Sequence, residues 1–316
     1  MSAPSLQDYI AKPPHPSRRQ GGWRQRRDAQ PAQPALLSAP TTPGEPVISI
    51  ITVVYNGQAT LERAVRSVLE QTYAHVEYIV IDGGSTDGTL EIIRRYEERI
   101  ALWLSEPDGG IFDAMNKGLA LASGDCVAIL NCDDYYAPRA VAAVVEALQR
   151  APAEAVYGDS IFVLEDIGLE RQVHAAPQLT RGMTLCHPAL FVARSAYARL
   201  GVYDLRYRYS ADFDFALRLH HAKVKWCKVP EPLAYFTGGG AAERHLVQAS
   251  WEALAILERQ AGLLGTLPYF CMFLKRVLLR GVNGCIRTLF GQRAYLWVKR
   301  RYYACRGFQS RKQDAG

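Results

Sequence analysis

Strand-like and helix-like patterns alternate four times between residues 46 and 130, and this alternation limits the possible fold more than any other feature. Residues 47–54 form a β-branched run too apolar for a solvated face, which predicts a central strand of a parallel sheet. Further strands are expected at 78–81, 101–104 and 126–130, with helices at 60–71, 90–98 and 112–122. The pattern predicts right-handed βαβ units, and so a Rossmann-like, mostly parallel α/β sheet with helices on both faces.

Polar residues follow three of these strands. Tyr55 and Asn56 follow the first, Asp82 ends the second and opens a glycine-rich loop, and Asn131 follows the fourth. Because open α/β sheets bind ligands beyond the carboxyl ends of their strands, we expect these residues to meet at one rim. Asp82 would accept hydrogen bonds there from a ribose hydroxyl or a base N–H, whereas Asp87 is expected to cap the next helix.

Two adjacent carboxylates, Asp133 and Asp134, come directly after the fourth strand. The repulsion between their negative charges must be offset, and a hard divalent cation can do this. Mg²⁺ or Mn²⁺ held by carboxylates commonly completes its coordination shell with substrate phosphates. The alternative is a solvated turn before the helix that follows Pro138. On a rim shared with Asp82, we favour a site for a metal and a diphosphate.

Four ordered blocks of sequence resemble glycosyltransferase family 2. They are residues 49–56, 71–73, 81–89 and 130–134, and the resemblance extends roughly from residue 46 to residue 240. It implies the GT-A fold and inverting transfer of a sugar from a nucleotide-diphosphate sugar, with uridine as the expected base. The block at 106–118 is similar to a bacterial subgroup, of the colanic-acid type, that builds capsular polysaccharide or exopolysaccharide on a commonly lipid-linked acceptor.

The resemblance also implies roles for individual residues. Those matched to the nucleotide-sugar site are Thr52, Val54, Tyr55, Asn56, Asp82, Lys117, Asn131 and Asp133. The family's metal motif, Asp-x-Asp, has Asn131 in its first place here, so the ligand for Mn²⁺ or Mg²⁺ lies between Asp133 and Asp134.

The second half of the chain carries the candidate acceptor side. Asp159 is expected at the end of a strand, and His187, which precedes a proline, either lines the acceptor site or is structural. Asp212 begins a predicted helix and matches the family's general base, although Ala211 replaces the usual second acid. A well-placed base of this kind contributes roughly 10²–10⁴-fold to a rate. Asp214 is expected to pair with Arg218.

The chain divides into three predicted parts. Residues 1–45 read as a disordered Pro/Arg-rich leader, whose arginines are solvated or touch phosphate. Residues 46–262 form the catalytic domain, with the nucleotide-sugar half at 46–135 and the acceptor half at 136–240. The glycines at 238–240 predict a turn or a mobile lid. Residues 263–316 form a basic amphipathic helical extension.

Charge is distributed unevenly along the chain. Residues 271–316 carry eleven bases and one acid, although the whole chain has a net charge of only +6, so the core between the basic ends is acidic. This argues against nucleic acid as the partner of the core. The extension suits an anionic membrane surface, or it packs on the catalytic domain with its basic face in water.

Two other functions remain open at this stage. The first is a sugar-phosphate nucleotidylyltransferase, which would need a basic residue in the loop at 55–59, where the sequence has none. The second is a nucleic-acid-binding protein that acts through the basic ends of the chain. The seven cysteines show no CxxC spacing, residues 1–45 lack the apolar region of a signal peptide, and no apolar run is long enough to span a membrane. We therefore expect a reduced, cytoplasmic protein that contacts the inner face of the membrane at most peripherally.

Overall fold

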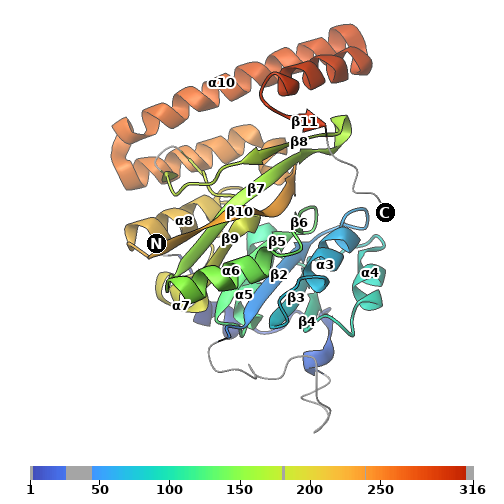
Figure 1. Ribbon diagram of the computed structural model, residues 1–316, viewed down its shortest axis with the longest axis vertical. Helices are drawn as coiled ribbons and strands as arrows, with labels where there is room; N and C mark the ends of the chain where they lie inside the picture. The colour runs from blue at the N-terminus through green and yellow to red at the C-terminus, as the bar shows by residue number, and fades with distance from the viewer. Residues whose placement is uncertain (1–2, 26–44, 180–181, 239, 311–316) are drawn as a thin grey trace.

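The computed structural model describes residues 3–25, 45–179, 182–238 and 240–310. A twisted mixed sheet runs through the molecule, with helices on both faces and a long C-terminal helix beside one end (Figure 1). Its main path has the strand order β1-β4-β3-β2-β5-β9-β7-β10-β6. This is the flanked, mostly parallel α/β sheet that the alternating pattern predicts.

Four parallel strands form the half of the sheet that the sequence located best. They are β2 (Ile48–Val54), β3 (Val76–Asp82), β4 (Leu102–Ser105) and β5 (Cys126–Asn131). Strand β2 lies between β3 and β5, and every residue of β2 is buried, as expected for a strand covered on both faces.

The other half of the sheet is mixed. Its strands are β6 (Tyr135–Tyr136), β7 (Ala155–Leu164), β8 (Leu169–Val173), β9 (Leu190–Ala193), β10 (Trp226–Thr237) and β11 (Gln309–Ser310). Strand β9 joins the two halves, because it pairs antiparallel with both β5 and β7. Two short 3-10 turns, Glu165–Ile167 and His187–Ala189, connect strands in this half.

Helices cover the two faces and bury two apolar clusters. One face carries α3 (Leu61–Leu69), α4 (Thr89–Arg95) and α6 (Ala140–Arg150); the other carries α5 (Ile111–Leu121), α7 (Arg194–Leu200) and α8 (Ala211–His221). Helix α5 lies so close to β2 that a Cβ on Gly118 would come within 2.4 Å of Ile51 Cγ2. Ile51 is fully buried there, a contribution of about 1.5–3 kcal/mol from burial of its side chain.

The N-terminal segment differs from the prediction of a disordered leader. Residues 3–25 contain α1 (Leu6–Ile10), which packs on α5, and β1 (Arg19–Gly21), which pairs antiparallel with β4 and extends the sheet. Arg18 and Arg24 pair with Glu106 and Glu77, whose side chains are almost fully buried. The segment is ordered because it supplies charges that the core needs, while residues 26–44 lie outside the described residues.

The C-terminal part also differs, because no boundary falls at residue 262. After α9 (Ala241–Arg244) comes α10, which is helical at every residue of Leu246–Ala304. The helix is not straight: in Figure 1 its path bends and doubles back beside β7 and β8. Strand β11 then pairs with β8, and Phe308 is buried against Leu164 and Leu169. Part of the extension therefore packs on the core, which was one of the two alternatives left open.

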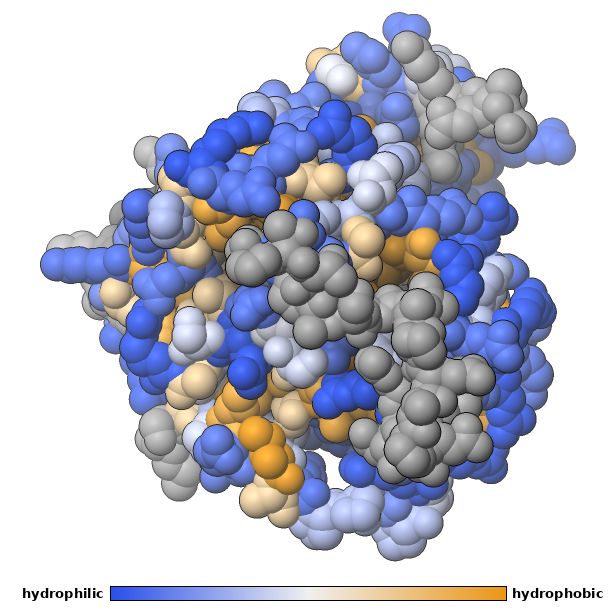
Figure 2. All heavy atoms as spheres, turned by 60° about the horizontal axis from the view of Figure 1, so that its bottom comes forward, coloured by the Kyte–Doolittle hydropathy of each residue, from blue (hydrophilic) through white to orange (hydrophobic). Residues whose placement is uncertain are grey.

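The surface of the molecule is mainly polar on the face shown in Figure 2, where apolar side chains gather only in small patches. Among the helices that the structure describes, none combines the length and the hydropathy of a membrane span.

Candidate functional site

The predicted polar residues do converge at the carboxyl ends of neighbouring strands. Val54, the last residue of β2, is opposite Asp82 on β3, and Val53 is opposite Asn131 on β5. The turns that follow these strands therefore share one edge of the sheet, where parallel α/β sheets bind ligands.

Asp82 is fully buried at this edge and holds the loop that follows it. Its carboxylate accepts hydrogen bonds from the Ser85 amide and hydroxyl, and from the Ser105 hydroxyl at 2.6 Å. Asp87 accepts from the Thr89 amide, at the first residue of α4, and from the Gln58 amide, so it ties two loops together. The N-cap position of α4 is Gly88 rather than the predicted Asp87.

The residues after β2 divide into buried and exposed positions. Thr52 is buried and accepts a hydrogen bond from the Tyr78 hydroxyl, and Val54 is buried beside it. The Tyr55 side chain is 65% exposed, so its ring is open to a ligand. Asn56, at a φ of 50°, accepts from the Thr86 amide and so joins the first loop to the second.

Asp133 and Asp134 have different surroundings, which sequence could not separate. Asp134 is buried and accepts hydrogen bonds from the Thr237 amide at 3.0 Å and the Asn131 side-chain amide at 3.3 Å. It ties the end of β5 to the end of β10, and burial next to the Asp133 charge raises its pKa well above the usual range. Both oxygens of the Asp134 carboxylate thus accept hydrogen bonds within the protein.

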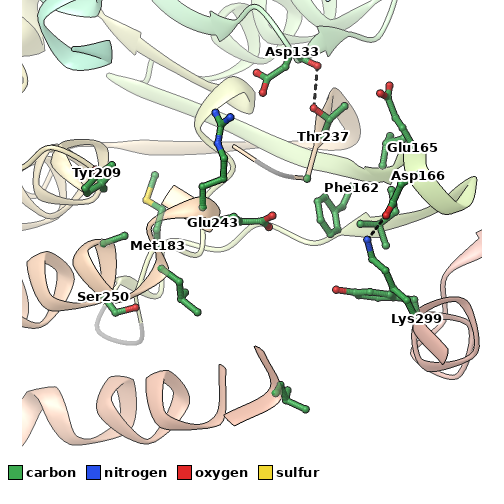
Figure 3. A pocket seen from close by; sticks show the side chains of 18 of the residues that line it. Asp133, Phe162, Glu165, Asp166, Met183, Tyr209, Thr237, Glu243, Ser250 and Lys299 are labelled. Atoms are coloured by element: carbon green, nitrogen blue, oxygen red, sulfur yellow. Dashed lines mark hydrogen bonds and ion pairs between the residues drawn. The ribbon is translucent and has the colours of Figure 1, made fainter. Parts of the chain in front are cut away.

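Asp133 instead lines a large pocket. Its main-chain oxygen accepts from Arg63 and from the Thr237 hydroxyl, while no other residue that the structure describes donates to its carboxylate (Figure 3). Burial raises the pKa of Asp133, and the positive charges of Arg244 and Arg63 lower it in part. A desolvated carboxylate facing two arginines can be stabilised further by a cation or by donors from a ligand.

The donor atoms here fit a hard divalent cation. Two residues before Asp133, the side-chain oxygen of Asn131 is buried and has no hydrogen-bond partner among the residues that the structure describes, an unusual state for a polar atom. Oxygen ligands of this kind suit Mg²⁺ or Mn²⁺. Within the residues that the structure describes, no cluster of three or more Asp, Glu, His or Cys side chains forms a protein-only metal cage. A cation at Asp133 would therefore draw most of its ligands from water and from substrate oxygens.

Asp212 lines the same pocket from the first turn of α8. Its carboxylate accepts from the Phe213 amide at 2.9 Å, and burial, with a smaller contribution from the charge of Glu252, raises its pKa to about 6. Such a carboxylate is ionised at neutral pH yet basic enough to take a proton. Asp214, two residues on, pairs with Arg218 at 2.9 Å, as predicted.

The pocket has a volume of about 1050 Å³ and lies between the catalytic core and α10. Asp133 and Thr237 lie at one end of the view in Figure 3, with Glu165 and Asp166 on one side and Ser250 of α10 on another. Lys299 of α10 pairs with Asp166, which fixes the C-terminal part of this wall. The C-terminal extension thus forms part of the site rather than a separate appendage.

Of the predicted site residues, only Asp133 and Asp212 line this pocket, and those at the ends of β2, β3 and β5 otherwise lie outside it. Lys117, His187 and Asp159 also lie outside it. Lys117 is buried, and its ammonium group contacts Glu106, Asp113 and the Pro107 carbonyl. His187 shares a hydrogen bond with the Tyr203 hydroxyl, and burial lowers its pKa to about 4, so its ring is neutral at neutral pH.

Asp159 sits in the middle of β7 rather than at a strand end, because β7 continues into the hairpin with β8. Burial favours its protonated form, but hydrogen bonds from Lys228, His174 and the Ala175 amide outweigh this and hold its pKa at about 2. Asp159 does not line the pocket that contains Asp212.

Sequence reasoning missed the two arginines next to Asp133. Arg244 lies in the four-residue helix α9, after the glycine-rich segment that follows β10, and a basic residue in that place was the available signal. Arg63 comes from the first turn of α3, where it reads as an ordinary solvent-exposed helix residue. Only the fold brings its guanidinium to the Asp133 carbonyl, seventy positions away.

A family model described as glycosyl transferase family 2 matches residues 49–209, just over half of the chain. The chain belongs to this family. An uncharacterized glycosyltransferase of Mycobacterium tuberculosis is 39% identical over 181 residues, which cover 55% of this chain and 68% of that protein. A PGL/p-HBAD biosynthesis glycosyltransferase of Mycobacterium bovis is 34% identical over 181 residues, 55% of this chain and 69% of that protein.

Solved structures show the same fold. The S. aureus TarS fragment in complex with UDP-GlcNAc matches with a TM-score of 0.55 at 15% identity, over 73% of this chain and 72% of that one. The chain spans only 43% of a longer TarS chain. The mannosyltransferase PcManGT of Pyrobaculum calidifontis, in complex with GDP-Man and Mn²⁺, has a TM-score of 0.54 at 20% identity, over 89% and 90% of the two chains. The protein is a nucleotide-sugar-dependent glycosyltransferase with the GT-A fold, and neither alternative function is supported.

Proposed function

We propose that this glycosyltransferase transfers a sugar with inversion to a hydroxyl group, and that Asp212 is its general base. As the acceptor oxygen bonds to the anomeric carbon, its proton passes to the Asp212 carboxylate. The bond from that carbon to the diphosphate breaks on the opposite face, and the nucleoside diphosphate leaves with the electron pair. The observation that carries this assignment is the Asp212 carboxylate, with its raised pKa of about 6, in the pocket that Asp133 also lines.

The leaving diphosphate would lie beside Asp133. We assign Asp133, with the side-chain oxygen of Asn131, to a Mn²⁺ or Mg²⁺ ion that accompanies the donor. When bound, such an ion neutralises negative charge that develops on a leaving diphosphate. Arg63 and Arg244, whose charges already act on Asp133, add positive potential at the same place.

The nucleoside is proposed to lie over the loops that follow β2 and β3. Tyr55 offers an exposed ring there, and Asn56 and the buried Asp82 keep the two loops together. A uridine nucleotide is our first choice, since the TarS neighbour binds UDP-GlcNAc; GDP-mannose is the second, after PcManGT.

The acceptor is proposed to be a lipid-linked saccharide in the assembly of a bacterial cell-surface polysaccharide, made at the cytoplasmic face of the membrane. Helix α10 both lines the acceptor pocket and exposes large apolar side chains, among them Trp251, Leu274 and Leu278 at 58%, 51% and 70%. Exposed Lys275 lies between the last two, and the chain beyond residue 270 is strongly basic. Apolar side chains beside excess positive charge suit an anionic lipid surface.

The test is a transfer assay with the purified full chain. UDP-GlcNAc and GDP-mannose are supplied in turn with Mn²⁺ and with lipid-linked saccharides extracted from bacterial membranes. Released nucleoside diphosphate is measured, and NMR gives the anomeric configuration of the product. We expect one donor to yield a product of inverted configuration. A product that retains the donor configuration would overturn the proposed mechanism.

A further inference from the structure

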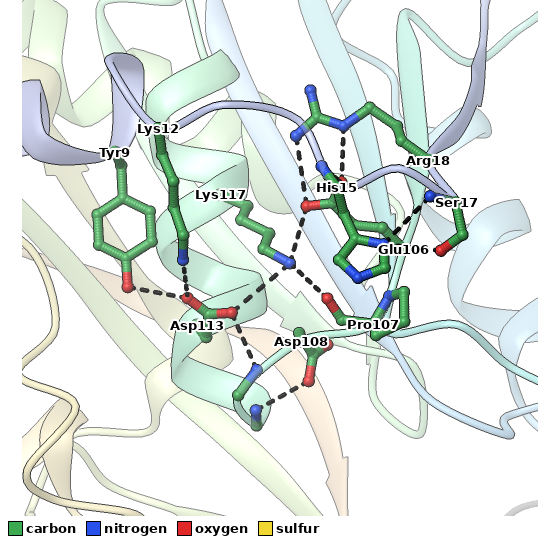
Figure 4. Close-up of polar contacts among 12 residues, drawn as sticks. Tyr9, Lys12, His15, Ser17, Arg18, Glu106, Pro107, Asp108, Asp113 and Lys117 are labelled. Carbon is green, nitrogen blue, oxygen red and sulfur yellow. Dashed lines mark hydrogen bonds and ion pairs between the residues drawn. The ribbon is translucent and has the colours of Figure 1, made fainter.

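The N-terminal residues 3–25, which we call the N-terminal strap, cross the edge of the sheet beside the donor loops. Helix α1 packs on α5, and β1 pairs with β4 so that Arg19 is opposite Ser105, the last residue of β4. The start of β1 therefore lies at the carboxyl end of β4, on the ligand-binding edge of the sheet. Figure 4 shows strap side chains directed at the loop that follows β4.

Glu106 begins that loop and receives the strap. Its side chain is only 4% exposed, yet it is paired with Arg18 at 2.7 Å and Lys117 at 2.9 Å, and it also accepts from the His15 amide. Burial alone would raise the pKa of Glu106, but Arg18 and Lys117 together hold it at about 2. Without Arg18, a buried carboxylate would keep only one of its two cations.

The same network fixes the rest of the loop, residues 106–110. Lys117 donates to the Pro107 carbonyl at 3.0 Å, and Asp113 accepts from the Gly109 amide at 3.0 Å. A second strap residue reaches Asp113, because the Tyr9 hydroxyl donates to it at 3.0 Å. The strap thus holds this loop at two carboxylates, as Figure 4 shows.

The loop in turn packs against the donor loop. The Glu106 amide donates to the Asp82 carbonyl at 3.1 Å. Asp108 lies so close to Gly83 that a Cβ there would be 2.4 Å from its carboxylate, and Gly84, at a φ of +82°, lies against Pro107. Any shift of residues 106–110 must therefore move residues 82–84, which belong to the proposed nucleoside site.

We propose that the N-terminal strap is a working part of the donor site, and that Arg18 is a positioning residue for nucleotide-sugar binding. Arg18 holds Glu106, Glu106 with Lys117 holds the loop at 106–110, and that loop sets the conformation of residues 82–84. The inference rests on the proposed location of the nucleoside. The inference also explains the role of buried Lys117, whose ammonium group binds Glu106 and the Pro107 carbonyl and so positions the loop rather than the ligand.

Arg24 provides a matched control in the same strap. It pairs at 2.8 Å with Glu77, whose side chain is 3% exposed, so its loss also leaves a buried glutamate without its cation. Glu77 is the second residue of β3 and bonds to Ser49 and Ser123, at the amino ends of the strands. Arg18→Ala thus removes an ion pair at the carboxyl ends of the strands, and Arg24→Ala removes a similar ion pair at their amino ends.

The experiment compares Arg18→Ala, Arg18→Lys and Arg24→Ala in the full chain. Hydrogen–deuterium exchange is followed in peptides that cover residues 82–89 and 106–112, and dissociation constants for UDP-GlcNAc and GDP-mannose are measured by calorimetry with Mn²⁺. We expect Arg18→Ala to accelerate exchange in both peptides and to weaken donor binding about fivefold or more, the lower range for coupled sites. Arg18→Lys should recover part of both effects, and Arg24→Ala should show neither.

Equal effects of Arg18→Ala and Arg24→Ala on these peptides would overturn the inference, because the strap would then contribute only general stability. Unchanged exchange in Arg18→Ala would overturn it as well. If the wild-type protein binds neither donor, the proposed choice of donor fails, and the exchange comparison still decides whether Arg18 positions the loops.

Discussion

Replacing Asp212 with asparagine should abolish transfer and stabilise the fold at the same time. Asparagine keeps the shape of the side chain and can still accept from the Phe213 amide, but it cannot take a proton. Loss of a general base costs roughly 10²–10⁴-fold in kcat. The wild-type rate should fall about tenfold per pH unit below the pKa of about 6, because only the ionised base is active.

The gain in stability follows from the same pKa. A carboxyl group raised from 3.8 to about 6 by folding binds its proton more tightly in the folded state. Ionisation of Asp212 therefore lowers the free energy of unfolding by an amount that depends on pH. The loss is zero well below pH 3.8, where the group is protonated in both the folded and the unfolded state. It is about 1 kcal/mol at pH 4.5 and at most about 3 kcal/mol above pH 6. Asp212→Asn should remove this cost, so its advantage over the wild type grows between pH 4.5 and pH 7.5.

Two assays on one preparation check the prediction. Denaturant unfolding gives the free energy of unfolding at pH 4.5 and 7.5, and released nucleoside diphosphate gives the rate. Asp214→Asn is the control in the same helix: it should lose about 1–3 kcal/mol with its bond to Arg218, and keep its transfer activity. Transfer at the wild-type rate by Asp212→Asn, or a loss of stability at pH 7.5, would refute the reasoning.

Three further outcomes are expected. Asp133→Asn should weaken Mn²⁺-dependent binding of UDP-GlcNAc by about tenfold or more. Asp134→Asn should keep that binding, because the Asp134 carboxylate already accepts a hydrogen bond from the Thr237 amide. Equal losses of binding for the two variants in calorimetry would argue against this difference in role. Excess chelator should stop transfer and added Mn²⁺ should restore it, so continued turnover in chelator would exclude a required metal. Trp251→Ser with Leu278→Ser should reduce binding to vesicles that contain anionic lipid by about tenfold in a sedimentation assay, and unchanged binding would remove the membrane proposal.

The parallel half of the sheet was predictable because its information is local. The β-branched run at 47–54 has no polar face, so it predicts a strand that is covered on both faces. Strand β2 occupies 48–54 and is buried along its whole length. The convergence of Asp82 and Asn131 followed from the rule that parallel strands end at one edge. The pairing of Asp214 with Arg218 was equally local, being set by helical spacing.

The strap and the pocket wall depended on contacts that are remote in sequence. Arg18 and Glu106 are 88 positions apart, so nothing near Arg18 showed that it would be held by a buried partner. Asp133 and Asp134 look alike in the sequence, and only the amide of Thr237 on β10, 103 positions from Asp134, distinguishes them. The sequence left open whether residues 263–316 pack on the core, because their basic composition hides the apolar positions, such as Phe308, that dock on the β7–β8 hairpin.

The central claim is that donor and acceptor chemistry meet in one pocket, with Asp133 beside the diphosphate and Asp212 beside the acceptor hydroxyl. The most direct measurement is the anomalous scattering of manganese in crystals grown with Mn²⁺ and UDP-GlcNAc. The account predicts a manganese peak at the Asp133 carboxylate, with the sugar of the donor extending into the cavity that Asp212 lines. A peak bound by Asp134 or Asp82, or a sugar directed away from Asp212, would contradict it.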